Sequence, residues 1–220
     1  MSIEAKGSYE DIDNLFISLF PLGLQDKKWL DLGKRHQNAY LRLVDLFKQE
    51  LSKQNIEDHL EKGDYKYIAE QATKVIQKST MVSLFEKIAF RNFIEQTSIH
   101  RDFADSLYAL LYNDYKKNFA QFVGVLGSLK DYKNANAAKW TVVSAFLCHS
   151  NPYEHVFIKP TTVKNIALFL GIDISYNSSP NIETYEKVRN MILDYKKVSK
   201  IAKEQDNIIA QAIMYVGLAI

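Results

Sequence analysis

Aromatic and basic side chains alternate with apolar ones in residues 153–159. If this segment is extended, its successive side chains point to opposite faces. One face would then carry Tyr153, His155, Phe157 and Lys159. Modules that bind single-stranded nucleic acid use such a face, with rings that stack on bases and cations that contact phosphates. The alternative is that the rings pack beneath a neighbouring helix and leave the lysine at the rim.

The same segment leads into a helix that we expect over residues 162–170. The free amides at a helix N-terminus attract anions such as phosphate, and Lys159 and Lys164 lie close to this one in sequence. The alternative is an ordinary threonine cap. We therefore predict a ligand-binding surface that favours single-stranded or structured nucleic acid. Its residues would be Tyr153, His155, Phe157, Lys159 and Lys164.

Cys148, His149 and His155 are the residues closest in sequence to a metal-ligand set. Adjacent residues on a helix point about 100° apart, so the first two do not readily share an ion. A structural zinc site needs four ligands, and no fourth is evident here. Cys148 lies near an expected helix C-terminus, where the helix dipole disfavours a thiolate nucleophile. We expect a buried cysteine beside partly exposed histidines, with no metal and no cofactor.

Paired carboxylates could serve acid–base chemistry, and the chain has two such pairs, Asp11/Asp13 and Asp102/Asp105. The first pair falls in a polar N-terminal segment that we expect to be loose. Asp102 falls in a first helical turn, where acids are favoured by electrostatics alone. Glycine-rich phosphate loops, G-x-S-x-G and H-E-x-x-H are absent from the sequence. An enzyme with an acid–histidine site is therefore the third hypothesis, and no catalytic residue is assigned.

The elements that would position these residues are mostly helices, because apolar residues recur every three or four positions along the chain. Ser83 and Glu86 form a capping box, and Gly171 is a typical C-terminal cap. We expect Ser179 to cap a helix that has Pro180 at its first position. The predicted helices span residues 29–51, 65–76, 83–93, 101–115, 119–129, 140–148, 162–170, 180–195 and 208–220.

Two short stretches have strand periodicity, residues 155–159 and 173–176, and the helix over 162–170 would cross between them. The predicted fold is therefore mainly α, a multi-helix, bundle-like domain with a small β-hairpin-like insert around residues 153–178. The loop-like stretch 130–139 is a possible internal boundary within a single domain of 220 residues.

Composition limits the class of protein. The chain is 47% hydrophobic and 25% charged, which is ordinary for a globular protein, and its 13 Tyr and 12 Phe can build a large core. A net charge of +2 argues against holding duplex DNA by charge alone. One cysteine, an N-terminus unlike a signal peptide and no stretch of about 18 apolar residues predict a cytoplasmic protein without a membrane span.

The second half of the chain resembles a family of uncharacterised bacterial proteins of similar length. The residues that carry the resemblance, over roughly 80–216, are Leu84 to Lys87, Lys139 to Thr141, Phe157 to Pro160, Tyr176, Pro180-Asn181, Thr184-Tyr185 and Asp206 to Gln211. The stretch Ala210 to Ile213 departs from the family's acidic-apolar-Gln-aromatic string. The resemblance implies a single-unit protein with no assigned activity, and it brings no catalytic residues.

The leading hypothesis is thus a non-enzymatic, nucleic-acid-binding protein. The alternative is a protein–protein interaction or homo-oligomerisation role through the apolar C-terminal helix. The basic residues between 187 and 203 are interspersed with acids, which is typical of a solvated helix face rather than of a phosphate-binding stripe.

Overall fold

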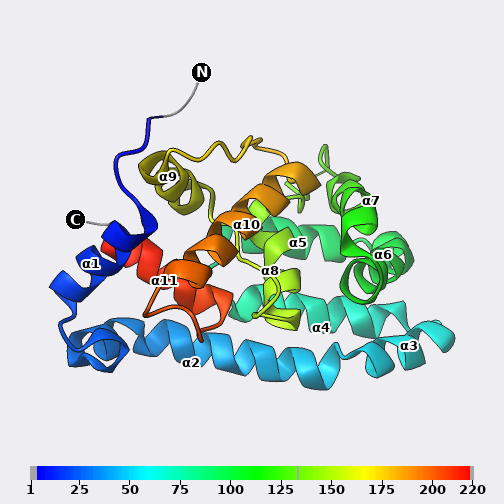
Figure 1. Ribbon diagram of the computed structural model, residues 1–220. Helices are drawn as coiled ribbons and strands as arrows, with labels where there is room; N and C mark the ends of the chain where they lie inside the picture. Colours follow the sequence, from blue (N-terminus) through cyan, green and yellow to red (C-terminus); the bar gives the residue numbers. More distant parts are fainter. Residues whose placement is uncertain (1–3, 133, 219–220) are drawn as a thin grey trace.

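The computed structural model describes residues 4–132 and 134–218, with the side chains of Arg35 and His36 left out. Helices make up most of the described chain, and the longer connections lie in its second half (Figure 1). In the first half they are α1 Tyr9–Leu19, the 3-10 turn η1 Gly23–Gln25, α2 Lys27–Glu50, α3 Lys53–Glu61, α4 Tyr65–Lys78, α5 Leu84–Ile94, the 3-10 turn η2 Thr97–Ile99 and α6 His100–Tyr112. In the second half they are α7 Tyr115–Gly127, α8 Trp140–Ser150, α9 Pro160–Leu170, α10 Ile182–Val198 and α11 Asn207–Gly217.

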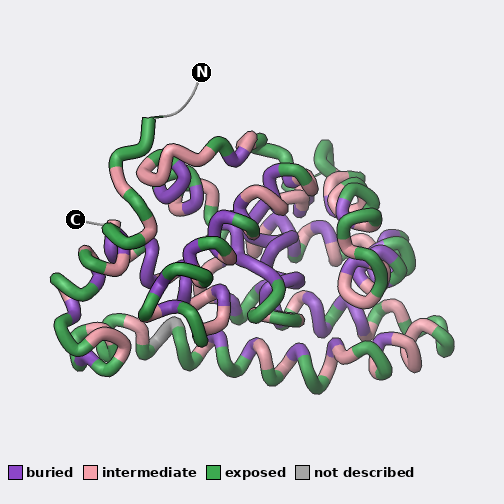
Figure 2. The backbone as a smooth tube through the Cα atoms, in the orientation of Figure 1, coloured by how far each residue is buried: buried purple, intermediate pink, exposed green. Residues whose placement is uncertain are grey.

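The centre of the molecule is α8, whose residues from Trp140 to His149 are all buried. Helices α2, α4, α5 and α6 pack around it. Phe146 of α8 lies with its ring centroid 5.8 Å from that of Phe90, 6.2 Å from Phe103 and 5.8 Å from Phe122. Such tilted and edge-to-face pairs are the favoured aromatic geometries. Figure 2 shows the resulting arrangement, with buried backbone at the centre and exposed backbone along the outer helices.

Helix α11 lies in the body of the protein rather than on its surface. It packs against α1 at one side and α10 at another, so segments from the two ends of the sequence are neighbours (Figure 1). Helices α11 and α1 approach each other closely, because a Cβ atom added at Gly217 would stand 3.1 Å from the carbonyl oxygen of Ile12. The apolar face predicted to mediate oligomerisation is therefore largely covered by the chain's own helices, and Tyr215 is its one large apolar side chain that is exposed among those described.

The prediction of a mainly α fold is confirmed, but the β-hairpin-like insert at 153–178 is wrong, since the described residues contain no strand. A turn covers residues 152–154, and the backbone amides of the extended stretch after it bond to side chains instead of to a second strand. The amide of Ile158 donates to Ser144 Oγ at 2.9 Å, and both backbone groups of Phe157 bond to Gln211. The polar backbone groups of a buried segment need hydrogen-bond partners, and side chains of α8, α10 and α11 provide them here.

The second predicted strand, 173–176, is also wrong, for a different reason. Ser175 adopts a φ of +44°, in the left-handed region, which turns the backbone out of a strand path. Asp173 Oδ1 accepts the Ser175 amide at 2.7 Å, and the Thr184 hydroxyl donates to the Ser175 carbonyl at 2.7 Å. Polar side chains again take the place of a strand partner.

The helix ends test the capping residues that the sequence predicts. The Ser83–Glu86 capping box is confirmed, with the Ser83 amide 2.9 Å from Glu86 Oε2. Gly171 is confirmed as the C-terminal cap of α9, at a φ of +67°. The cap predicted at Ser179 is wrong, because Asn181 Oδ1 accepts the Thr184 amide at 2.9 Å and α10 begins two residues later than expected. In the predicted boundary stretch 130–139, Ala135 and Ala137 are fully buried in the common core.

Candidate functional site

The five residues predicted to form a binding surface are split between the interior and the surface. Tyr153 is 64% exposed, and Lys159 and Lys164 are also exposed. His155 and Phe157 are buried, at 6% and 4% exposure. The alternating face does not form, because residues 155–158 run beneath α10 and α11 and are buried on both sides of the chain. Phe157 therefore follows the alternative reading, a ring that packs into the core.

Two of the exposed members, Tyr153 and Lys164, have intramolecular partners. The Lys164 ammonium lies 5.0 Å from the ring centroid of Tyr176, and the Lys196 ammonium lies 5.7 Å from that of Tyr153. Such contacts are cation–π geometries. Lys159 is the N-cap residue of α9, and no side chain caps this helix, so the threonine cap that was the alternative to an anion site does not form. Pro160 occupies the first helical position, where its missing amide costs nothing.

The predicted metal-ligand candidates do not converge. Cys148 and His149 are fully buried neighbours in α8, whereas the His155 ring bonds to the Tyr185 hydroxyl, with Nδ1 3.1 Å from Oη. Within residues 4–132 and 134–218, no group of three metal-binding side chains is found. Burial raises the pKa of the Cys148 thiol well above its usual value, so the sulfur stays protonated and is a poor nucleophile.

The carboxylate pairs have structural partners. Asp11 forms a capping box with Ser8, so the N-terminal segment predicted to be loose is instead a capped helix from Tyr9 onward. Asp13 accepts hydrogen bonds from the Tyr195 hydroxyl at 2.6 Å and the Ser199 hydroxyl at 2.7 Å. These bonds tie α1 to the end of α10. Asp105 lies 3.7 Å from Arg101 in an exposed ion pair one turn apart.

A pocket of about 310 Å³ lies between α2, α8, α11 and the loop after α4. We call it the α2–α11 pocket. The residues that line it are Leu24, Gln25, Trp29, Leu30, Gly33, Gln37, Tyr40, Leu43, Ser79, Thr80, Met81, His149, Gln205, Ile208, Ile209 and Ala212. None of these carries a charged Asp, Glu, Lys or Arg side chain, and most of them are apolar. Its size and lining are typical of a site for a small organic molecule.

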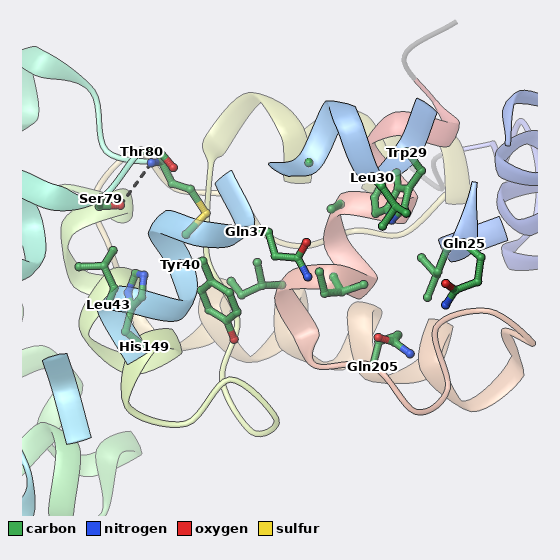
Figure 3. Close-up of a pocket in the computed structure, with 16 residues that line it drawn as sticks. Gln25, Trp29, Leu30, Gln37, Tyr40, Leu43, Ser79, Thr80, His149 and Gln205 are labelled. Carbon is green, nitrogen blue, oxygen red and sulfur yellow. Dashed lines mark hydrogen bonds between the residues drawn. The ribbon is translucent and has the colours of Figure 1, made fainter. Parts of the chain in front are cut away.

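The pocket has two unlike ends (Figure 3). His149, Tyr40 and Leu43 lie together at one end, beside Ser79 and Thr80 from the loop after α4. Trp29, Leu30 and Gln25 lie at the other end, where α2 begins. Gln37 lies between the two ends. A molecule inside would thus meet a polar group at one end and an indole ring at the other.

His149 supplies that polar group. Its Nδ1 lies 2.6 Å from the carbonyl oxygen of Ala145, one turn earlier in α8. Its Nε2 is buried and has no hydrogen-bond partner among the residues that the structure describes. Burial lowers the pKa of the imidazole to about 4, although the bond to Ala145 acts in the opposite direction. The ring is therefore neutral at physiological pH.

Tyr40 lies next to His149, with the two ring centroids 6.0 Å apart. Its hydroxyl donates to Asp206 Oδ2 at 3.1 Å, while Asp206 Oδ1 accepts the amides of Ile208 and Ile209 at 2.9 Å each. Burial and the nearby Asp206 carboxylate raise the pKa of the Tyr40 phenol, so it remains protonated. Asp206 thus caps α11 and orients Tyr40 at the edge of the pocket.

The sequence patterns around Tyr40 and His149 predicted buried helices, but they did not predict a pocket. Tyr40 belongs to the regular apolar pattern of α2, and His149 ends an otherwise apolar helix. We expected His149 to be partly exposed, which is wrong, since its side chain is fully buried. A polar residue in a helix with no exposed side is the feature that could have identified it, because a buried polar atom needs a partner.

Comparisons with known proteins assign no family: no family model, no curated protein and no solved structure matches the chain. Among the described helices, none has the length and apolar character that crossing a membrane requires.

Proposed function

We propose that the protein binds a small, neutral, mainly apolar molecule in the α2–α11 pocket. The observation that carries this proposal is the combination of an apolar lining of about 310 Å³ with the unpartnered, buried Nε2 of His149 at one end. A pocket that is mostly apolar and contains a few placed polar groups is the usual form of a small-molecule site. A buried polar atom without a partner also costs free energy, and a ligand that bonds to it would recover that cost.

Binding is favoured over catalysis by the chemistry of this histidine. A general base works best when its pKa lies near the working pH. The pKa of His149 is lowered to about 4, which makes the imidazole a weak base at neutral pH. The Asp206 carboxylate, which bonds to Tyr40, also accepts two backbone amides of α11.

Nucleic-acid binding stays a prediction, now limited to the exposed residues Tyr153, Lys159 and Lys164. If it occurs, Lys159→Ala and Lys164→Ala should weaken the binding of single-stranded RNA, and the affinity should fall as salt rises. Self-association also stays a prediction, although α11 is mostly covered by α1 and α10. The pocket is the more specific feature, because it combines shape, apolar lining and a polar anchor.

The proposal can be tested with N-phenyl-1-naphthylamine, a neutral probe that fluoresces in apolar surroundings. Its roughly 17 non-hydrogen atoms, at about 0.4 kcal/mol each, correspond to a dissociation constant on the order of 10 µM. We expect saturable binding of one probe per chain. The measurement is a fluorescence titration of the full chain.

Two glycines provide a matched pair of variants. A Cβ atom added at Gly33, which lines the pocket, or at Gly124, which lies on α7 outside it, meets no atom within 4 Å. Gly33→Leu should fill the pocket and weaken probe binding by at least about tenfold, since the ligand loses its space. Gly124→Leu should leave binding within about twofold. Absence of saturable binding, or equal binding by both variants, would contradict the proposal.

A further inference from the structure

The hydrogen-bonding state of His149 follows from its neighbours. A neutral imidazole carries one N–H, and the second nitrogen carries a lone pair. The carbonyl oxygen of Ala145 can only accept, so the Nδ1 atom 2.6 Å away must be the donor. Nε2 is then an acceptor, enclosed at the inner end of the α2–α11 pocket with no described donor.

We infer that the molecule bound in this pocket is a neutral ring compound with a hydroxyl or N–H group, which it donates to His149 Nε2. This inference rests on the proposed function and names the class of ligand. The donor would lie at the end formed by His149 and Tyr40, and the ring system would extend toward Trp29.

Anionic ligands are disfavoured by two features of the site. A carboxylate would place its oxygen against the Nε2 lone pair, where neither atom has a proton to share. The Asp206 carboxylate, which accepts a hydrogen bond from Tyr40 at 3.1 Å, would also repel an anion bound beside Tyr40. Among the lining residues that the structure describes, there is no Lys or Arg side chain to compensate.

Cationic ligands are disfavoured because burial of a charge needs a partner. The described part of the lining contains no Asp or Glu side chain. Both oxygens of Asp206 are already engaged, Oδ1 by the amides at the start of α11 and Oδ2 by Tyr40. A neutral donor satisfies Nε2 without bringing a charge into this apolar space.

The test compares three probes that share one ring system in displacing N-phenyl-1-naphthylamine at pH 7. They are 2-naphthol, which donates a hydrogen bond, 2-methoxynaphthalene, which cannot, and 2-naphthoate, which is anionic. We expect 2-naphthol to bind about tenfold more tightly than 2-methoxynaphthalene, the factor that one hydrogen bond to a buried acceptor provides. We expect no displacement by 2-naphthoate.

His149→Phe removes the acceptor and keeps a ring of similar size. In this variant 2-naphthol and 2-methoxynaphthalene should bind within about twofold of each other. Gly124→Leu, which lies on α7 outside the pocket, should keep the tenfold preference. A second measurement needs no substitution: the nitrogen NMR signal of His149 Nε2 should move on addition of 2-naphthol and stay in place with 2-methoxynaphthalene.

Equal binding of 2-naphthol and 2-methoxynaphthalene to the unaltered protein would overturn this inference, as would tighter binding of 2-naphthoate. The first result would leave the proposed function standing if the fluorescent probe still binds and Gly33→Leu still blocks it, whereas the second would also contradict the neutral ligand of the proposed function. Failure of the fluorescent probe itself to bind would overturn both.

Discussion

The carboxamide of Gln211 pairs with the backbone of Phe157 as a neighbouring strand would. Its Nε2 donates to the Phe157 carbonyl at 2.7 Å, and its Oε1 accepts the Phe157 amide at 3.0 Å. Both residues are buried. Four residues earlier on the same helix, Asn207 Nδ2 donates to the carbonyls of Tyr153 and His155 at 3.1 Å each. One face of α11 therefore holds the extended segment in place.

We predict that Gln211→Leu destabilises the protein by about 3 kcal/mol, because it leaves a buried amide and a buried carbonyl without partners. Urea unfolding followed by circular dichroism measures the change. Gln77→Leu is the control: Gln77 also donates to a backbone carbonyl, that of Lys87 at 3.0 Å, but it is exposed. It should change stability by less than about 0.5 kcal/mol. An equal loss of unfolding free energy in the two variants would show that the buried bonds to Phe157 stabilise the protein no more than an exposed bond does.

We predict that Cys148 is unreactive in the folded protein. The thiol is fully buried, and burial raises its pKa well above the usual value, so the reactive thiolate is scarce. Ellman's reagent at pH 8 should release almost no thionitrobenzoate over an hour in buffer. In guanidinium chloride, the same sample should release one equivalent, since the chain has one cysteine. Rapid stoichiometric reaction in buffer would mean that α8 is not buried as described.

We predict that stability falls as the pH drops from about 6.5 toward 4. Burial lowers the pKa of His149 from 6.5 to about 4 in the folded protein, so in this window the unfolded chain takes up a proton that the folded protein does not. Above 6.5 neither state is protonated and this contribution is constant. The loss for His149 should approach about 3 kcal/mol at the acidic end.

Urea unfolding at several pH values, in the unaltered protein and in His149→Phe, measures this contribution. The variant should lose less stability over the same window, and the remaining slope includes His155, whose pKa burial also lowers to about 4. Identical slopes for the two proteins would contradict the assignment of a buried, neutral imidazole at position 149.

We predict that Gly171→Ala destabilises the protein by about 1–2 kcal/mol. Gly171 ends α9 at a φ of +67°, where a side chain is strained, and an added Cβ atom would stand 2.8 Å from the backbone nitrogen of Ala5. Gly124→Ala is the matched control within α7, where the new atom meets nothing within 4 Å and helix propensity favours alanine by up to about 1 kcal/mol. Thermal unfolding should show shifts of opposite sign, and shifts of the same sign would be inconsistent with the close approach at Ala5.

Much of the helical architecture could be predicted from local patterns. The apolar spacing identified α2, an almost continuous apolar run identified α8, and the Ser83–Glu86 box identified the start of α5. These features depend on residues three or four apart, whose interactions are present in the sequence itself. The insert could not be predicted in the same way. Alternation over residues 155–159 indicated an extended backbone but not its partner, and the partner was a set of side chains on α8, α10 and α11.

The candidate site belonged almost wholly to the tertiary structure. The sequence by itself determined that α8 is apolar and that His149 interrupts this pattern at its end. Only packing decided that His149 and Tyr40, more than a hundred positions apart in sequence, enclose a pocket with α11. Packing also buried Phe157 and left Lys159 outside. The residue types determine which groups can form hydrogen bonds. The packing of distant helices decides which of these groups come into contact, and which buried group has no partner.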